Sequence, residues 1–396
     1  MSDSQMTNTT DEAQNNTPQT QRDTPETRRD TPRNSAPGTP APSAAPSSDK
    51  PLAWLDGEGL HFDDAKTLAA VRRKPVSATM ISGLVDRCPA QYLFSDKLKD
   101  LVIPVTPQDA RIRGIVFHRA CELYYARPDA RRGAPIDPEA FEECKTKALE
   151  EHPEVRNDPE ASAWLEAASR RFCAMGPEAT DVTVAGYRDD RGRQSPALEM
   201  KVTGRLDGVG RRVFGAIDRL ITPNPDNPRN VVIDDYKTGG KACVYSDRMR
   251  FPDFSYQRQQ TLYSMLLEGD TRTFSDGWHL LGGRLIYPMA EYVTLHDDNA
   301  GTDVKVSVQG QGAIIRLDVR NPEYRRRTLD DAAKASDALD RESETNLFEY
   351  RPSVLCAWCP LAKICPAARI GSKENAQKAF ADQPDAQTLA PAIVRA

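Results

Sequence analysis

The sequence lacks any hydrophobic run near the ~20 residues that a membrane-spanning helix needs. Its N-terminus also lacks the apolar core of a secretory signal peptide. We therefore expect no membrane partner and a cytoplasmic location. The pattern G-x4-G-K-[ST] is missing as well, so the chain carries no P-loop of its own for binding a nucleoside triphosphate.

An excess of positive charge is also absent. The 53 Lys and Arg residues are outnumbered by 58 Asp and Glu residues, which gives a formal net charge of −5. This balance argues against a protein that coats nucleic acid non-specifically. It does not exclude an enzyme that acts on nucleic acid, because a metal site needs clustered carboxylates whose charge the bound cations offset locally.

Both ends of the chain are poor in apolar side chains. Residues 1–50 are mainly Ser, Thr, Pro, Asn, Gln and charged residues, and residues 371–396 are similar. Such segments bury too little apolar surface to offset the entropy cost of ordering, so we expect two disordered tails. Residues 51–370 remain, which is enough for one large domain with an inserted helical lobe at 128–180.

The spacing of apolar residues changes along this domain. Helical spacing predicts helices at 77–98, 111–126, 138–151, 159–175, 255–268 and 329–344, the first of them bent at Pro89. Alternation with a period of two predicts strands at 182–187, 197–202, 213–221, 231–236, 283–295 and 313–319. The cluster of strands from 182 to 236 predicts a mainly antiparallel sheet in that part of the chain.

Two of these strands, 213–221 and 231–236, flank a turn rich in Pro, Asn and Asp, which is typical of adjacent strands. The first contains Asp218, and the second ends in Asp234 and Asp235. Because side chains alternate along a strand, Asp235 and Lys237 share one face, whereas Asp234 shares the other with Tyr236.

Asp218 and Asp235 are therefore candidate ligands of Mg²⁺ or Mn²⁺, which prefer carboxylate oxygens. A bound ion of this kind activates water for attack on a phosphate. Lys237 would orient that nucleophile or stabilise charge on the phosphate oxygens. The alternative is that Asp218–Arg219 and Asp235–Lys237 are surface ion pairs at strand ends.

Two predicted helices carry further candidates. His118 lies on a largely apolar helix face, where a histidine taken alone is more often a hydrogen-bonded core residue than a ligand. Gln259 and Tyr263 are four residues apart and so lie on one face of their helix. The simpler interpretation makes Tyr263 a core residue and Gln259 a surface residue.

Cysteines cluster near the end of the domain, at 351–367. Disulfides are not expected among the eight cysteines of a cytoplasmic chain. Cys356, Cys359 and Cys365 form a C-x2-C-x5-C pattern that is hard to explain by packing. A metal site would need a fourth ligand from a distant part of the chain. From spacing alone, Zn²⁺ and an iron–sulfur cluster are both compatible with these thiols.

The order of these motifs resembles the RecB-type branch of the PD-(D/E)XK nuclease superfamily. It is most similar to stand-alone actinobacterial RecB-like exonucleases, and also to the nuclease domain of AddB and the CRISPR adaptation nucleases. The motifs that carry the resemblance are G-x3-H (Gly114, His118), G-x-I-D-R (215–219), D-Y-K-T-G (235–239), Q-x3-Y (Gln259, Tyr263), and one Cys before Pro (Cys88) with the C-terminal C-x2-C-x5-C.

The resemblance implies an α/β, restriction-endonuclease-like core with a mixed central sheet flanked by helices. It implies a metal-dependent DNA nuclease, an exonuclease of repair or recombination, that acts on single strands or duplex ends. The implied catalytic residues are Asp218, Asp235, Lys237, Gln259 and Tyr263. The implied metal ligands are His118, Asp218, Asp235 and the backbone carbonyl of Tyr236. A structural [4Fe–4S] cluster is implied at Cys88, Cys356, Cys359 and Cys365.

Several alternatives remain at this stage. The chain could be a non-catalytic DNA-binding or scaffolding module that kept the nuclease fold. It could also be a zinc-stabilised module that binds RNA or protein. Glu199, in the strand before Asp218, fits a surface acid better than a site residue. If the protein works with a helicase, the absence of a P-loop places the motor on a separate polypeptide.

Overall fold

The computed structural model describes residues 53–62, 64–98, 110–243, 254–297 and 302–353, together with Cys356, Cys359, Leu361, Cys365, Ala367 and residues 387–388. These residues belong to one compact unit of the chain, 46–396. The predicted tail at 1–50, and nearly all of the predicted tail at 371–396, lie outside the described residues. No helix in the described segments combines the length and apolar character that crossing a membrane requires.

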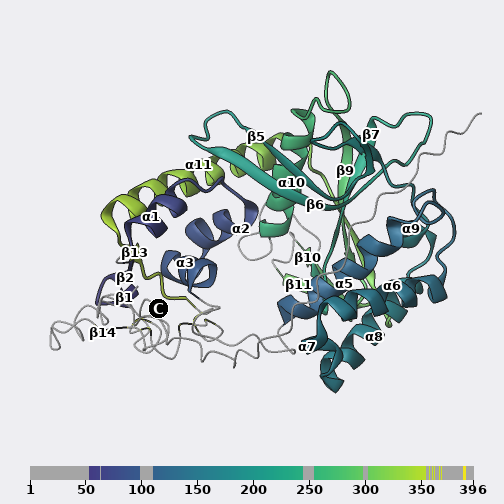
Figure 1. Cartoon of the computed structure of the whole chain (residues 1–396), viewed down its shortest axis with the longest axis horizontal. Helices are drawn as coiled ribbons and strands as arrows, with labels where there is room; N and C mark the ends of the chain where they lie inside the picture. The colour runs from purple at the N-terminus through teal and green to yellow at the C-terminus, as the bar shows by residue number, and fades with distance from the viewer. Residues whose placement is uncertain are drawn as a thin grey trace, which may run out of the picture. The chain divides into compact units, whose positions relative to one another are not determined.

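A five-stranded mixed sheet forms the centre of the domain (Figure 1). Its strands, in spatial order, are β12 (Ala313–Leu317), β9 (His279–Tyr287), β7 (Asn230–Tyr236), β6 (Arg212–Ile221) and β5 (Leu198–Arg205). All neighbouring pairs are antiparallel except β7 and β9, which are parallel. The mixed central sheet is thus confirmed, and so are the predicted strands at 213–221 and 231–236.

Helices cover both faces of this sheet. On one face lies α10 (Phe254–Glu268), whose Leu262 and Leu266 belong to a core that includes Ile217 and Ile233. We call this cluster the main core. Because apolar residues of the strands point alternately to the two faces, each strand supplies both layers.

The other face carries α5 (Ala110–Tyr125) and the helical lobe. Phe117 of α5 packs with Phe172, Tyr236 and Ile286 in a second cluster, the lobe core. The lobe consists of α6 (Pro138–Glu151), α7 (Pro153–Arg156), α8 (Pro159–Cys173) and α9 (Pro177–Thr180). Figure 1 shows α5, α6 and α8 lying beside one another below the sheet.

The helix predicted at 77–98 is broken into three pieces. Ser77 caps α2 (Ala78–Ile81) by accepting a hydrogen bond from Met80 N at 3.2 Å. The π-helix η1 (Ser82–Asp86) and α3 (Pro89–Lys97) follow, with Cys88 at the N-cap of α3. The break comes where Pro89 removes a backbone donor, which a continuous helix would need.

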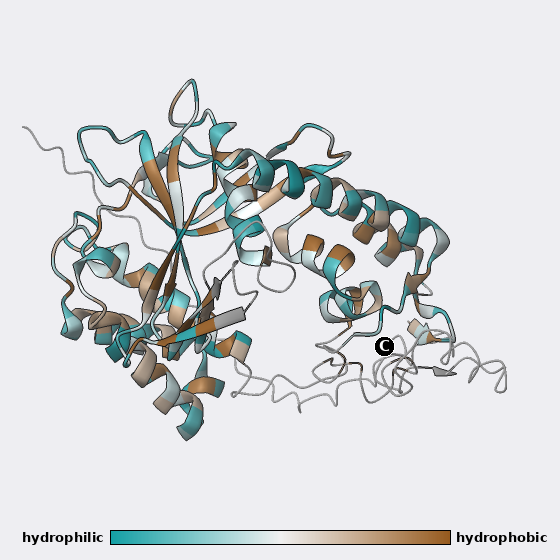
Figure 2. Ribbon diagram, turned by 180° about the vertical axis from the view of Figure 1, so that it is seen from behind, coloured by the Kyte–Doolittle hydropathy of each residue, from teal (hydrophilic) through white to brown (hydrophobic). Residues whose placement is uncertain are grey.

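A long helix, α11 (Pro322–Thr345), packs across this region, and its mostly hydrophilic colour is visible in Figure 2. It begins seven residues before the predicted start at 329, because Asn321 supplies an N-cap that accepts from Glu323 N. The buried guanidinium of Arg258 on α10 binds Asp331 of α11 and Asp86 of η1. This network fixes α10 against the segment that leads to Cys88.

The remaining strands form smaller sheets. One has the order β13 (Phe348–Glu349), β2 (Gly59–Phe62), β1 (Ala53–Leu55) and β14 (Gln387–Thr388). Another contains β11 (Thr302–Ser307), β10 (Tyr292–Asp297) and β8 (Lys241–Cys243), and a hairpin joins β3 (Gly186–Arg188) to β4 (Gln194–Pro196). Pairing of β13 with β2 brings the end of the domain beside its beginning.

Two strand predictions need correction. The strand predicted at 283–295 is two strands, because a turn after Tyr287 separates β9 from β10. In the predicted strand 182–187, the ladder begins only at Gly186, whereas Val184 makes an isolated bridge to Ile221. Val182 and Val184 are buried in the lobe core, and residues 183–184 pair with other segments only through isolated bridges.

Candidate active site

His118 joins α5 to the ends of β6 and β7. Its Nδ1 lies 3.3 Å from Asp218 Oδ2. Its Nε2 lies 3.1 Å from the carbonyl oxygen of Tyr236. The backbone N–H of Tyr236 donates to the same Asp218 oxygen at 2.8 Å. The structure therefore brings together the imidazole, one carboxylate and the backbone group that the sequence resemblance selected.

The second group lies on the α10 side of the sheet. Lys237 Nζ is 2.5 Å from Asp235 Oδ2 and donates to Gln259 Oε1 at 3.2 Å. The amide of Gln259 donates to Asp235 Oδ1 at 3.2 Å and to the Tyr263 hydroxyl at 3.1 Å. Asp235 and Lys237 are thus held on one face of β7, as strand alternation predicts, and Gln259 connects them to Tyr263.

Gly215 allows Tyr263 to reach this position. A Cβ atom on Gly215 would come within 2.6 Å of the Tyr263 ring, closer than a real contact allows. The glycine of the 215–219 motif is therefore required because the aromatic ring of α10 lies directly on the backbone of β6. The simpler interpretation of Tyr263 as a core residue is also correct in part, since its side chain is buried in the main core.

Asp234 lies on the opposite face of β7 and has a separate set of partners. Its carboxylate accepts hydrogen bonds from Arg219 at 2.7 Å and 3.0 Å, and from Arg284 of β9 at 2.7 Å and 2.8 Å. All three side chains are buried. The predicted alternative of surface ion pairs is wrong for Arg219, which pairs with buried Asp234 rather than with Asp218.

The regular alternation of side chains between the two faces of the sheet is interrupted at Glu199 of β5 and at Asp218 of β6. Leu198 packs against the lobe core, whereas Met200, two residues later, is in the main core. Regular alternation would put both on one face. Glu199 has φ of +46°, a conformation that non-glycine residues rarely adopt, and this accounts for the inversion. The irregularity lies where the pairing of β5 with β6 skips Glu199 and Asp218.

This inversion brings Glu199 into the site. Ligand atoms of His118, Glu199 and Asp218 all lie within 4.8 Å of one another. The sequence favoured a surface role for Glu199, because the alternation of apolar and polar residues along the strand does not show that the side chains change faces at this residue. Backbone strain of this kind is common where a functional side chain must be aimed away from its regular direction.

The pKa values of the three carboxyl groups in the site shift in different directions. Burial and the charge of Asp218 raise the pKa of Glu199 to about 7. Burial also raises the pKa of Asp235 to about 6, against the opposing effect of Lys237. Burial would raise the pKa of Asp218 too, but the charge and hydrogen bond of His118 outweigh it and hold that pKa below its ordinary value.

These residues fit a divalent cation. Ligand atoms of Glu199, Asp218 and His118 lie within 4.8 Å of one another, and Asp235 is close enough for its charge to raise the pKa of Glu199. A carboxylate-rich set of oxygens with one imidazole suits Mg²⁺ or Mn²⁺. The donors present are therefore those that such an ion requires.

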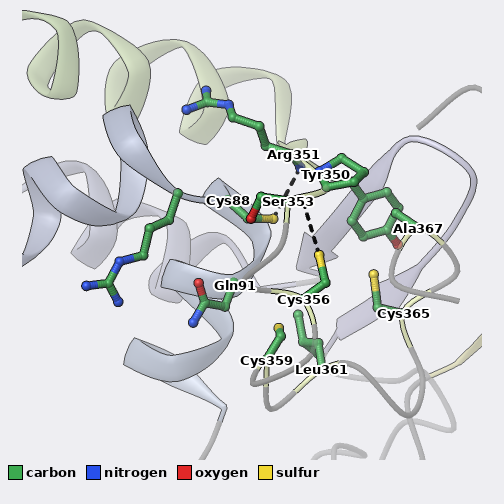
Figure 3. Close-up of a pocket in the computed structure, with 12 residues that line it drawn as sticks. Cys88, Gln91, Tyr350, Arg351, Ser353, Cys356, Cys359, Leu361, Cys365 and Ala367 are labelled. Carbon is green, nitrogen blue, oxygen red and sulfur yellow. Dashed lines mark hydrogen bonds between the residues drawn. The ribbon is translucent and has the colours of Figure 1, made fainter. Parts of the chain in front are cut away.

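The four predicted cysteine ligands line a single pocket (Figure 3). Cys88 comes from the start of α3, and Cys356, Cys359 and Cys365 come from the C-terminal segment. All four are free thiols. The close-up shows sulfur atoms of both segments pointing toward the same pocket, so the distant fourth thiol that the C-x2-C-x5-C pattern requires is in place.

Two of these sulfur atoms accept backbone hydrogen bonds. Backbone N–H groups of Arg351 and Ser353 donate to Cys88 Sγ at 3.3 Å and Cys356 Sγ at 3.4 Å. Hydrogen bonds of this kind stabilise metal-bound thiolates. Burial and the nearby thiols raise the pKa of Cys359 to about 12, so a metal ion would have to supply the positive charge that keeps these sulfurs ionised.

Comparison with known proteins supports one assignment. A search of curated proteins gave no match. Among solved structures, the chain is similar to a protein from Eubacterium rectale named "Putative exonuclease", with 11% identity, a TM-score of 0.37, and coverage of 78% of this chain and 91% of that one. The sequence model of the PD-(D/E)XK nuclease superfamily matches residues 75–366, which include every site residue described above. The chain therefore belongs to the PD-(D/E)XK nuclease superfamily.

Proposed function

We propose that this nuclease is a RecB-like exonuclease that hydrolyses phosphodiester bonds in DNA with Mg²⁺ or Mn²⁺. The observation that carries the proposal is the hydrogen-bonded set of Asp235, Lys237 and Gln259, held beside His118 and Asp218. A module that only bound DNA would have no chemical use for a largely buried lysine paired to the carboxylate of Asp235.

Each side chain has a distinct part in this proposal. His118, Glu199, Asp218, Asp235 and the Tyr236 carbonyl would hold the cation, which when bound supplies an activated water and screens the phosphate charge. Lys237, whose pKa is raised by Asp235 against the effect of burial, stays protonated and can stabilise charge on the phosphate oxygens. Gln259 fixes the position of that ammonium group by accepting one of its hydrogen bonds.

For the cysteine pocket we propose a structural [4Fe–4S] cluster, with Zn²⁺ as the alternative. The pocket joins Cys88, at the start of α3, to the segment after β13, and the Cys88 thiol also contacts the carbonyl oxygen of Glu349, 261 positions further along the chain. Its thiols are separate from the residues around Lys237, so the group would stabilise the fold rather than take part in hydrolysis. A role in DNA repair or recombination is part of the same proposal.

A cleavage assay tests the activity. Purified protein with Mn²⁺ or Mg²⁺ should degrade linear labelled DNA with free ends, and should leave end-blocked and circular DNA intact. Asp235→Ala and Lys237→Ala should remove cleavage while the protein stays folded. Cleavage of circular DNA would show an endonuclease. If the two variants cleaved DNA as fast as the unaltered protein, the assignment of the site would be overturned.

A further inference from the structure

Two large apolar side chains are exposed beside the candidate active site. Tyr256 is 38% exposed and Ile115 is 43% exposed. Six large hydrophobic residues are exposed to this degree in the described part of the chain. Two of the six lie next to polar groups of the candidate site, Tyr256 beside Lys237 and Ile115 beside His118. Exposure of this kind costs solvation free energy and often marks a place where a ligand binds.

Tyr256 belongs to the functional face of α10. It precedes Gln259 by three residues and Tyr263 by seven, which places the three side chains on one side of the helix. The ring of Tyr256 lies 4.4 Å from Lys237 Nζ, in a cation–π contact. The aromatic ring is therefore next to the ammonium group that would contact the scissile phosphate.

Ile115 lies on the α5 side of the same site. It lines a groove together with His118, Glu199 and Arg111. His118 follows Ile115 by one helical turn, so the apolar side chain stands beside the proposed metal ligands. The groove thus combines a basic residue, which suits the sugar–phosphate backbone, with an apolar residue, which suits a base.

We propose that Tyr256 binds an unstacked nucleobase next to the scissile phosphate, with Ile115 bounding the groove, so that the site takes a single strand. This inference rests on the proposed nuclease function. A base is attached through one sugar to its phosphate, so the nucleotide held at Lys237 brings its base within reach of the Tyr256 ring. Bases inside a duplex are already stacked and unavailable for this contact, whereas those of a single strand or a frayed end are free to bind.

Binding measurements on two oligonucleotides test the proposal. The first is a short single-stranded DNA labelled in its middle, and the second carries abasic sites in place of the terminal nucleotides at both ends. Ca²⁺ replaces Mg²⁺ so that binding is followed without turnover. Tyr256→Ala should raise the Kd for the base-bearing strand roughly tenfold, as loss of one stacking contact does, and leave the Kd for the abasic strand unchanged. Tyr256→Phe, which keeps the ring, should bind both strands like the unaltered protein.

Leu281→Ala is the matched control, because Leu281 is 45% exposed but lies on β9 at the end remote from Asp235. It should bind both strands normally. An equal loss on both strands with Tyr256→Ala would overturn the proposal, because it would mean that Tyr256 only positions Lys237. Unchanged binding of the base-bearing strand would overturn it as well. Absence of cleavage by the unaltered protein with Mn²⁺ would instead contradict the nuclease function, and the comparison of the two strands would still test base binding.

Discussion

Asp234 and Asp235 are consecutive in β7, and their side chains lie on opposite faces of the sheet. Asp234 is enclosed by the guanidinium groups of Arg219 and Arg284, and Asp235 is paired with Lys237. Alternation along the strand separates the two carboxylates into different surroundings. One therefore belongs to an ionic network inside the fold and the other to the candidate active site.

Substitution of each acid should separate stability from activity. Asp234→Asn leaves two buried guanidinium groups without a counter-charge, so we expect a loss of about 3–5 kcal/mol in the free energy of unfolding. Asp235→Asn should abolish cleavage with a smaller loss of stability, because it leaves one partly exposed ammonium group, rather than two guanidinium groups, without a counter-charge, and burial already disfavours the charge of Asp235. Urea denaturation and a cleavage assay on both variants measure the two effects. Comparable stability of the two variants would contradict the separation.

Gly215 should be intolerant of a side chain. In Gly215→Ala the new methyl group would meet the ring of Tyr263, which must move and release its hydrogen bond to Gln259. Since small displacements in a catalytic site are costly, we expect a fall in kcat of roughly 10²-fold. Steady-state kinetics on single-stranded DNA provide the measurement.

The matched control for this change is Gly204→Ala. Gly204 also lies in the sheet below α10, but its Cβ would meet only the end of the Leu266 side chain, at 3.2 Å. Because that side chain can shift, activity should stay close to that of the unaltered protein. A similar loss in both variants would show that the effect comes from the sheet in general and not from Tyr263.

The strands of the hairpin, the α10 face and the three C-terminal cysteines were predictable because each depends on local spacing, whereas Cys88 was found only through the resemblance to a known family. Strand alternation correctly separated Asp235 from Asp234, and helical spacing placed Gln259 beside Tyr263. Arg284 was not predictable as a partner of Asp234, because it comes from β9, and the pairing of β7 with β9 is a tertiary contact.

Glu199 was missed for a different reason. Its approach to His118 depends on a positive φ that inverts the faces of β5, and no pattern of apolar residues marks that conformation. Tyr256 was also missed, although its spacing of three residues before Gln259 was a signal. Its significance depends on the contact with Lys237, which comes from another element.

Loss of one cysteine ligand should remove the metal group and lower stability. We expect protein purified without oxygen to be brown and to contain iron and sulfide, and Cys88→Ser to lose both. Because a group that binds only the folded state stabilises it, the free energy of unfolding should fall by about 3 kcal/mol or more. Cys121→Ser is the control, since Cys121 is buried in the lobe core away from the pocket. A colourless protein with stoichiometric zinc would refute the cluster.

Glu342 should make stability depend on pH. It is buried on α11, its Oε2 has no hydrogen-bond partner among the residues that the structure describes, and burial raises its pKa from 4.5 to about 7. A carboxyl group with a raised pKa in the folded state favours folding most below its unfolded pKa, and this contribution is lost as pH rises through about 7. Glu342→Gln, which resembles the protonated form, should match the unaltered protein near pH 4.5 and exceed its stability by about 3 kcal/mol at pH 8.

Urea denaturation at both pH values measures this difference, with Glu344→Gln as the control. Glu344 lies two residues further along α11, and its side chain is 66% exposed in an ion pair with Arg72. Exposed pairs contribute little to stability, so this variant should follow the unaltered protein at both pH values to within about 1 kcal/mol. If Glu342→Gln gave the same difference at pH 4.5 and pH 8, the effect would come from packing, because only a titrating carboxyl group makes the difference grow between them.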